Sequence, residues 1–205
     1  MTILLSDAGK RYNREWIFRH LNYEFKMGNA YAITGSNGSG KSTLLQVIGG
    51  AVQHSEGTIS YTLANKEIAI ENHHQHLTIA TPYLDLPDEM TLLEFLQFHQ
   101  NFKPFLSSVT IAEIIATVGL TKASNKQIRN FSSGMKQRVK LAQAFFSDVP
   151  VVLLDEPCTN LDAEGIALYH SLVTTYCSKR LLIISSNEEQ EIHFCKERLN
   201  VVDYK

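Results

Sequence analysis

The residues with the clearest capacity for chemistry form a glycine-rich stretch, Gly35–Ser42, which reads GSNGSGKS. This spacing matches G-x-x-x-x-G-K-[ST], a loop that binds nucleotide phosphates. Its glycines let the backbone approach a phosphate at positive φ, and its N–H groups point at the anion together with the start of the next helix. Lys41 would reach the outer phosphates, and Ser42 would offer its hydroxyl to Mg²⁺.

The sequence around this stretch supports the match. Residues 30–34 are predicted to form a short buried strand, and Ser42 through Ile48 the opening of a helix that ends near Gly49-Gly50. A plain glycine-rich turn is the alternative. Because Lys41 and Ser42 stand at the predicted helix start, the phosphate loop is favoured.

An acidic pair provides a second chemical feature. The apolar run Val151–Leu154 predicts a strand buried on both faces, and it ends in Asp155-Glu156. Carboxylates at the carboxyl end of a parallel strand point into the crevice where such sheets bind ligands. Asp155 is placed to hold the Mg²⁺ shell, and Glu156 to orient an attacking water or accept its proton. A solvated acidic pair is the alternative, and the phosphate loop earlier in the chain disfavours it.

A second helix start carries anion-binding character. Phe131–Arg138 reads FSSGMKQR, with small hydroxyl residues and a glycine before a predicted helix over 134–146. Simple N-capping by Ser132 or Ser133 is the alternative. One γ-phosphate needs only one such helix start, unless the second serves a nucleotide on another copy.

The elements that must position these residues alternate along the chain. Strands are predicted over 2–7, 15–26, 57–63, 66–70, 77–80, 151–154, 181–184 and 199–202. Helices are predicted over 91–102, 111–118, 134–146 and 163–177, and a last one follows the strand at 181–184 and runs through about 195; a polar link covers 122–130. In the first of these helices, Leu92, Phe95, Leu96, His99 and Phe102 form a stripe expected to face the core. The alternation predicts an α/β fold with a mostly parallel sheet covered by helices on both faces.

Composition narrows the function classes. The chain has 205 residues and a net charge of −2, which gives no reason to expect nucleic-acid binding. Its three cysteines lack CxxC spacing and fit reduced thiols of the cytosol. No apolar stretch of about 18 residues predicts a membrane span, and the N-terminus does not resemble a signal peptide. Residues 72–76, NHHQH, form a polar connection rather than a metal site because no carboxylate or cysteine stands at ligand spacing.

Four segments in order resemble the ATPase subunit of ABC transporters: Gly35–Ser42, Phe131–Lys136, Val151–Glu156 and Thr159–Asp162. The resemblance covers essentially the whole chain and is most specific in the second segment, which is similar to the family signature. It implies a single ABC ATPase domain over 1–205 with a P-loop NTPase fold. That fold would include a mostly parallel sheet, an antiparallel β subdomain and a small helical subdomain at roughly 84–130, which touches the membrane partner.

The resemblance also implies a head-to-tail dimer in which the signature of one subunit covers ATP held by the other. ATP and Mg²⁺ are the implied cofactors, with Ser42 and Asp155 on the metal and Glu156 and Asn187 as catalytic residues. Tyr12 is similar to the aromatic that stacks on adenine, a surface tyrosine at a strand end being the alternative. The nucleotide-binding residues are Tyr12, Gly35, Ser36, Asn37, Gly38, Ser39, Gly40, Lys41, Ser42 and Thr43; the signature residues are Ser132, Ser133, Gly134 and Met135; the D-loop residue is Asp162.

Two positions depart from the family pattern. Tyr83 stands where the family has a glutamine that touches the metal and the attacking water, and a tyrosine offers no amide carbonyl. Asn187 stands where the family has a histidine that reaches the γ-phosphate, and an amide donates only a neutral hydrogen bond. We therefore expect a slow or strongly partner-dependent ATPase.

The function that the resemblance implies is an ATP-hydrolysing subunit that powers a membrane transporter through nucleotide-driven dimerisation. Its size is similar to that of the haem-exporter type and related small exporters. The expected partners are a second ATPase subunit, identical or different, and integral membrane transporter subunits, which place the chain on the cytoplasmic face of the membrane. Two alternatives are an ABC ATPase switch acting on ribosome or DNA, and a phosphate-loop kinase or GTPase. The former type usually joins two ATPase units or carries coiled coils, and the latter lacks the Phe131–Lys136 signature.

Overall fold

The computed structural model describes residues 1–205 and divides into two compact units. The sheet unit comprises Met1–Ile79, Val149–Glu156 and Ser178–Lys205. The helical unit comprises Ala80–Asp148 and Pro157–Cys177. The chain thus leaves the sheet unit twice and returns to it twice, so each unit is built from segments distant in sequence.

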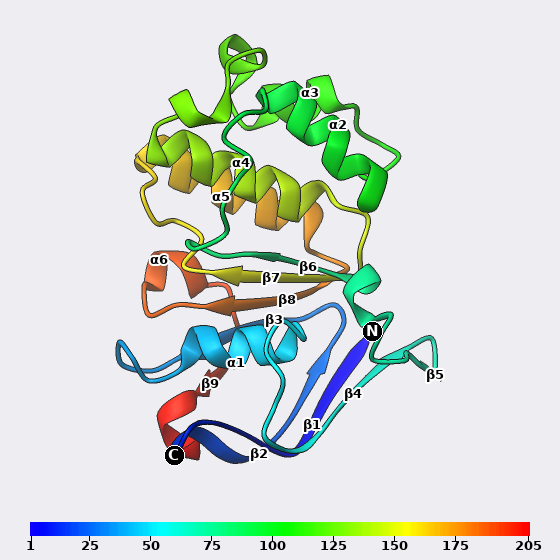
Figure 1. Ribbon diagram of the computed structural model, residues 1–205, viewed down its shortest axis with the longest axis vertical. Helices are drawn as coiled ribbons and strands as arrows, with labels where there is room; N and C mark the ends of the chain where they lie inside the picture. The colour runs from blue at the N-terminus through cyan, green and yellow to red at the C-terminus, as the bar shows by residue number, and fades with distance from the viewer. The chain divides into compact units, whose positions relative to one another are not determined.

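The sheet unit contains two sheets (Figure 1). The antiparallel sheet has the strand order β2-β1-β4-β5, and the second sheet has the order β6-β7-β8-β3-β9, in which β7–β8, β8–β3 and β3–β9 pair in parallel. The strands are β1 Thr2–Tyr12, β2 Glu15–Lys26, β3 Ala30–Thr34, β4 Glu56–Leu63, β5 Lys66–Glu67, β6 Leu77–Ala80, β7 Val151–Asp155, β8 Leu181–Ser185 and β9 Glu197–Asn200. The predicted α/β class, with a mostly parallel sheet and a separate antiparallel sheet, is confirmed.

The core of the sheet unit explains why its elements form where they do. All five residues of β7 and all five of β8 are buried, as the apolar runs predict for strands covered on both faces. Helix α1, Lys41–Ile48, packs on β3, β7 and β8 through Leu44, Leu45 and Ile48. Burying each of these side chains stabilises the fold by roughly 1.5–3 kcal/mol. The helix that carries the phosphate loop is thereby fixed on the sheet.

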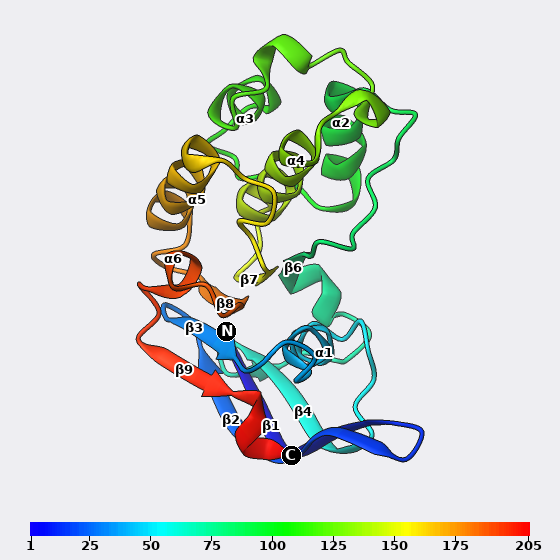
Figure 2. The ribbon, with the colours of Figure 1, turned by 90° about the vertical axis from the view of Figure 1, so that its left-hand side faces the viewer.

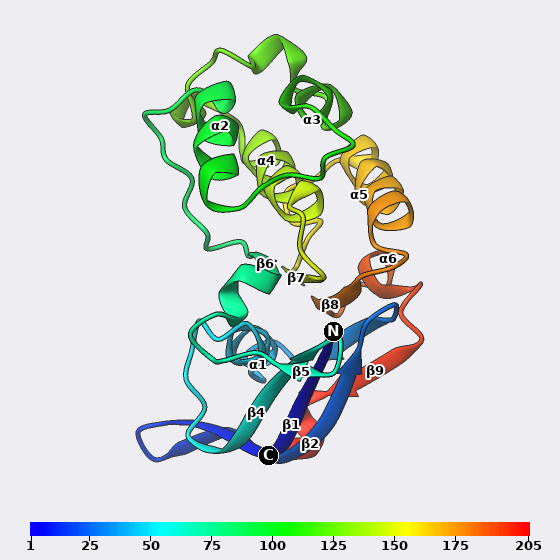
Figure 3. The ribbon, with the colours of Figure 1, turned by 90° about the vertical axis from the view of Figure 1, so that its right-hand side faces the viewer.

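The helical unit is organised around a central helix. It contains α2 Leu92–Phe102, α3 Ile111–Thr117, α4 Ser133–Phe146 and α5 Ala163–Tyr176. Helix α4 contacts the other three, and Figure 2 and Figure 3 show it between α2, α3 and α5. Both α2 and α3 begin with a capping box, Thr91 with Glu94 and Thr110 with Glu113, in which side chain and backbone bond in both directions.

Several predicted boundaries are wrong. β1 runs to Tyr12 rather than 7, because bulges let it continue pairing with β2 past the positive φ of Asp7. The second hairpin strand covers only Lys66–Glu67. The helix after β8 covers only Glu189–Ile192 (α6), because the chain must turn back to pair β9 with β3. The chain ends in a 3₁₀ turn, Val201–Tyr204, and the polar link holds two more, Thr121–Ala123 and Ile128–Asn130.

Two residues contradict the expected burial. Phe102 is 74% exposed and packs on Phe98, which is 45% exposed, with ring centroids 4.9 Å apart, because α2 ends at this residue and offers no further turn to cover it. His73, expected in a polar connection, is buried and stacks on Tyr61 at 4.9 Å. Its ring nitrogens contact the carbonyl oxygens of Gly49 and Ile70, so it closes the end of α1.

Candidate functional site

The phosphate loop lies between β3 and α1, as the sequence predicts. Gly35, Gly38 and Gly40 have φ angles of +143°, +77° and +107°. At Gly40, the N-cap of α1, a Cβ would collide with Cγ2 of Ile17. These positions therefore require glycine for backbone conformation and, at Gly40, for space as well.

Lys41 begins α1 and is buried. Its ammonium donates a hydrogen bond to the carbonyl oxygen of Gly35, at 3.0 Å, and so folds back over its own loop. The Oγ of Ser39 is buried in the same loop with no hydrogen-bond partner. A lysine ammonium and an unpaired hydroxyl thus converge where the loop would meet a phosphate.

The acidic pair lies on the same sheet edge as the loop. In the parallel register Asp155 pairs with Ser185, and Ser185 with Ile33, two residues before the loop begins. Asp155 on β7 and Ile33 on β3 are therefore two strand spacings, or roughly 10 Å, apart across the sheet. Asp155 is 2% exposed, and its Oδ1 has no hydrogen-bond partner. A buried, unpaired carboxylate oxygen is costly unless a cation or donor joins it, so the residue fits a divalent metal ion.

Glu156 differs from its neighbour in exposure and backbone. It is exposed, has φ +44°, and its N–H donates to the carbonyl oxygen of Ser185 at 2.9 Å. The positive φ turns the chain sharply after β7, so one carboxylate of the pair is buried and the other faces solvent. This arrangement suits one residue for metal coordination and the other for contact with water.

Asn187 and Tyr12 complete the predicted residues of the sheet unit. Asn187 follows β8 and hydrogen-bonds the backbone of Gly35 with both ends of its amide, at 2.7 and 3.1 Å. Tyr12 ends β1, is about half exposed, and has the ammonium of Lys10 4.7 Å from its ring centroid. Its ring face is therefore attractive to a positive or π-stacking group.

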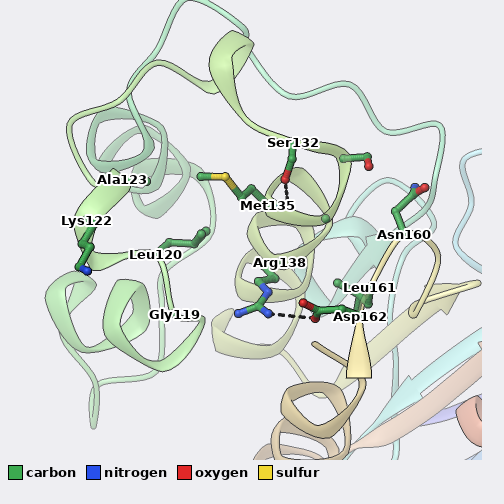
Figure 4. A pocket seen from close by; sticks show the side chains of 12 residues that line it. Gly119, Leu120, Lys122, Ala123, Ser132, Met135, Arg138, Asn160, Leu161 and Asp162 are labelled. Carbon is green, nitrogen blue, oxygen red and sulfur yellow. Dashed lines mark hydrogen bonds and ion pairs between the residues drawn. The ribbon is translucent and has the colours of Figure 1, made fainter. Parts of the chain in front are cut away.

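The signature segment lines a pocket of about 470 Å³ in the helical unit (Figure 4). Ser132 is the N-cap of α4, and its Oγ accepts from the N–H of Met135 at 3.2 Å, so Ser132 rather than Ser133 makes the cap. A Cβ on Gly134 would lie 2.9 Å from the carbonyl oxygen of Asn160. Glycine here permits a close backbone approach.

Asp162 lies beside this pocket. It caps α5 by accepting from the N–H of Gly165 at 2.8 Å, and Arg138 lies 3.3 Å away (Figure 4). The backbone bond first, and Arg138 second, lower the pKa of the Asp162 carboxyl. The guanidinium of Arg138 also reaches Glu164 at 3.6 Å and the carbonyl oxygen of Val118 at 3.4 Å. The residue predicted as the D-loop aspartate is thus ionised and held in place.

A model of the family described as "ABC transporter" matches residues 18–159. The chain belongs to this family. This ABC ATP-binding domain is 30% identical over 190 residues to YybJ of Bacillus subtilis, an ABC transporter ATP-binding protein. The alignment covers 91% of this chain and 86% of YybJ. It is 32% identical over 175 residues to the cytochrome c biogenesis ATP-binding export protein CcmA of Xylella fastidiosa, covering 84% of this chain and 78% of CcmA.

The fold of this ABC domain matches that of solved ATP-binding cassettes. One, solved as a dimer in a post-hydrolysis state with ADP and Pi, has a TM-score of 0.79 at 21% identity, covering 97% of this chain and 94% of its own. No helix of the present chain combines the length and apolar character needed to cross a bilayer.

One interaction in the helical part of this ABC domain was not found from its sequence. Lys140 of α4 is buried and donates to the carbonyl oxygens of Thr81 and Pro82, at 3.1 and 2.6 Å. Desolvation lowers its pKa. These bonds fix the chain just before Tyr83, whose side chain is 81% exposed. The only sequence signal was a lysine next to the apolar stripe of the helix, which is usually a solvated position.

Proposed function

We propose that this chain is the ATP-binding and ATP-hydrolysing subunit of a membrane transporter, and that ATP drives its dimerisation. The observation that carries the proposal is the unpaired, buried Oδ1 of Asp155 on the sheet edge that also bears the phosphate loop. A metal-ready carboxylate beside a phosphate-binding helix start supports phosphoryl transfer with Mg²⁺. The family match and the export function named for CcmA support the coupling to transport.

The proposed nucleotide site uses groups of the sheet unit. The loop N–H groups and Lys41 bind the phosphates, and the ring of Tyr12 stacks on adenine. Ser42 and Asp155 would hold Mg²⁺, which supplies charge neutralisation to the phosphates when bound. The remaining nucleotide contacts are assigned to Gly35, Ser36, Asn37, Gly38, Ser39, Gly40 and Thr43.

Glu156 is the proposed catalytic carboxylate. It directly follows Asp155 and is exposed, so it can hold a water molecule and accept its proton while Asp155 remains buried. A glutamine at this position would keep the shape but remove the base. Binding would then survive while hydrolysis stops.

The second half of the ATP site is assigned to another subunit. Ser132, Ser133, Gly134 and Met135 line an open pocket that needs a facing partner, and Asp162 borders it. The dimer seen for the solved cassette with ADP and Pi supports a pair of subunits, and the head-to-tail arrangement is part of this proposal. The partner in that pair is a second copy or a different ATPase subunit.

The proposed membrane partner is an integral transporter subunit at the cytoplasmic face. The export function named for CcmA supports an exporter. The helical unit, including the predicted subdomain at roughly 84–130, is the proposed contact region. When the tagged chain is expressed in its native cells and purified from solubilised membranes, an integral membrane protein should co-purify with it. Recovery of ribosomes or DNA in place of it would contradict the transporter proposal.

The decisive experiment is Glu156→Gln. With ATP and Mg²⁺, gel filtration should show this variant as a dimer at high protein concentration, while ATPase activity falls by about 100-fold or more. Glu71→Gln, an exposed glutamate elsewhere in the sheet unit, is the matched control and should leave both properties unchanged. Monomer alone in the presence of ATP, for Glu156→Gln at high concentration, would refute dimerisation.

A further inference from the structure

The amide of Asn187 makes a two-point contact with a single residue of the phosphate loop. Its Nδ2 donates to the carbonyl oxygen of Gly35 at 2.7 Å, and its Oδ1 accepts from the N–H of Gly35 at 3.1 Å. Both hydrogen-bonding ends of the side chain are therefore used within the sheet unit. An amide can do this because it carries a donor and an acceptor side by side.

The contact continues the strand ladder by other means. β3 and β8 pair in parallel as far as Ile33 and Ser185, and the N–H of Ser186 then donates to the carbonyl oxygen of Ile33 at 3.1 Å. Beyond this point the two chains separate toward the loop and toward α6. The side chain of Asn187 replaces the backbone as the partner of Gly35, one step further along the ladder.

Gly35 also accepts a hydrogen bond from the side chain of Lys41. The carbonyl oxygen of Gly35 accepts from Nζ of Lys41 at 3.0 Å as well as from Asn187. A phosphate that attracts the Lys41 ammonium takes this donor away from Gly35. The bond from Asn187 then remains to satisfy the carbonyl oxygen of Gly35, which has φ +143° and where an added Cβ would lie 2.6 Å from Ser39 Oγ.

We propose that Asn187 is a positioning residue that holds the Gly35 peptide, so that the phosphate loop keeps its shape when Lys41 turns to a phosphate group. This inference rests on the proposed ATP function. It assigns Asn187 to the loop and not to the γ-phosphate, where the resemblance would place it. The loop meets the phosphates that ADP and ATP share, so the contact serves both nucleotides equally.

We call the two hydrogen bonds between Asn187 and Gly35 the latch, and its presence is tested without nucleotide. In ¹⁵N-labelled wild-type protein, the Gly35 amide should exchange with solvent about tenfold or more slowly than that of the exposed Gly38 in the same loop. In Asn187→Ala this protection should be lost, while the control Asn29→Ala, at the other end of β3, should retain it. Equal exchange of Gly35 and Gly38 in the wild-type protein would overturn the latch, whether or not the chain binds ATP.

The role in binding is tested by calorimetry with ADP and with ATP. Asn187→Ala should lower the affinities for ADP and ATP by the same factor, about tenfold, because it removes two hydrogen bonds from the loop. Asn187→Asp should be at least as weak, since an oxygen then faces the Gly35 carbonyl. Asn187→His should not restore ADP affinity, because the two imidazole nitrogens point apart.

Two results of the calorimetry would contradict the proposed role of Asn187. Unchanged ADP affinity in Asn187→Ala, or an ATP affinity that falls several-fold more than that of ADP, would place the side chain on the γ-phosphate and overturn the proposal. Asn187→Ser adds no charge beside the phosphates and provides the same comparison if Asn187→Ala does not fold. A wild-type chain that binds neither nucleotide would refute the proposed function, while Gly35 protection would still report on the latch.

Discussion

Two helix starts are proposed to bind phosphate in this chain, and they use glycine for different reasons. At the start of α1, Gly35, Gly38 and Gly40 adopt positive φ angles, and the N-cap has no side-chain bond. At the start of α4, Ser132 supplies an ordinary side-chain cap, and Gly134 is needed because the carbonyl oxygen of Asn160 lies close to it. The φ requirement lies within the loop itself, with Ile17 adding a steric restriction at Gly40, whereas the requirement at Gly134 comes from a residue 26 positions away in the same unit.

The difference shows which kind of site a short motif describes. A loop whose shape depends on its own φ angles is encoded in eight consecutive residues. A helix start whose shape depends on a distant carbonyl is encoded only together with that neighbour. Substitutions at the two sites should therefore fail in different ways.

The largest expected effect is at the first helix start. Gly40→Ala places a side chain at φ +107° against Ile17, and it should weaken ADP binding by about 100-fold or more in calorimetry. Gly134→Ala should leave ADP affinity of the isolated chain within about twofold, yet reduce ATP-dependent dimerisation and turnover by about tenfold, since a displacement of a few tenths of an ångström suffices to misplace the pocket wall.

The control for this pair is Gly28→Ala. Gly28 also has a positive φ, +84°, but a Cβ there would meet nothing within 4 Å. It should lower the melting temperature while preserving ADP affinity. Equal losses of ADP affinity in Gly40→Ala and Gly134→Ala would break the comparison between the two helix starts.

The sequence predicted the parts of the molecule that depend on local patterns. The buried strands β7 and β8 and the phosphate loop follow from apolar runs and glycine spacing. The short α6 and the exposed Phe102 were missed because strand pairing and helix ends override periodicity. The bonds of Asn187 and Lys140 were missed because they join residues 152 and 58–59 positions apart.

In each unit a buried lysine donates hydrogen bonds to backbone carbonyl oxygens, but only one of the two lysines can be recognised from the sequence. Lys41 donates to the carbonyl oxygen of Gly35, and Lys140 donates to those of Thr81 and Pro82. The loop motif identifies the first lysine, whereas the second stands in a helix with no motif. A phosphate is the proposed alternative partner of Lys41, while the bonds of Lys140 hold the chain before Tyr83.

A smaller effect is expected at Lys140. Lys140→Met keeps the apolar stem but removes both charged hydrogen bonds, and it should lower the free energy of unfolding by about 2 kcal/mol in urea denaturation. Hydrogen exchange of Thr81 and Tyr83 should rise in parallel. Lys136→Met, one turn earlier and paired with Asp88 near the surface at 2.9 Å, is the matched control and should change stability by less than about 1 kcal/mol. If the two variants are equally stable, Lys140 does not pin the segment.

The smallest effect sharpens the comparison through pH. His99 of α2 contacts Ser147 Oγ at 3.0 Å and stacks on Phe105, and burial, with Lys103 as a lesser cause, lowers the pKa of its ring from 6.5 to about 4. The unfolded chain therefore binds the extra proton first, so this contribution to stability is present above pH 6.5 and is lost as the pH falls toward 4.

Since the ring is partly exposed, the loss should be on the order of 1–2 kcal/mol. His99→Gln keeps a neutral donor toward Ser147 and should remove this part of the pH dependence in urea denaturation at pH 7 and pH 5. Glu94 and Glu113, whose carboxyl pKa values the capping bonds lower, act in the same direction in both proteins and cancel in the difference. An unchanged pH dependence in His99→Gln would mean that the ring does not hold its neutral form in the folded helical unit.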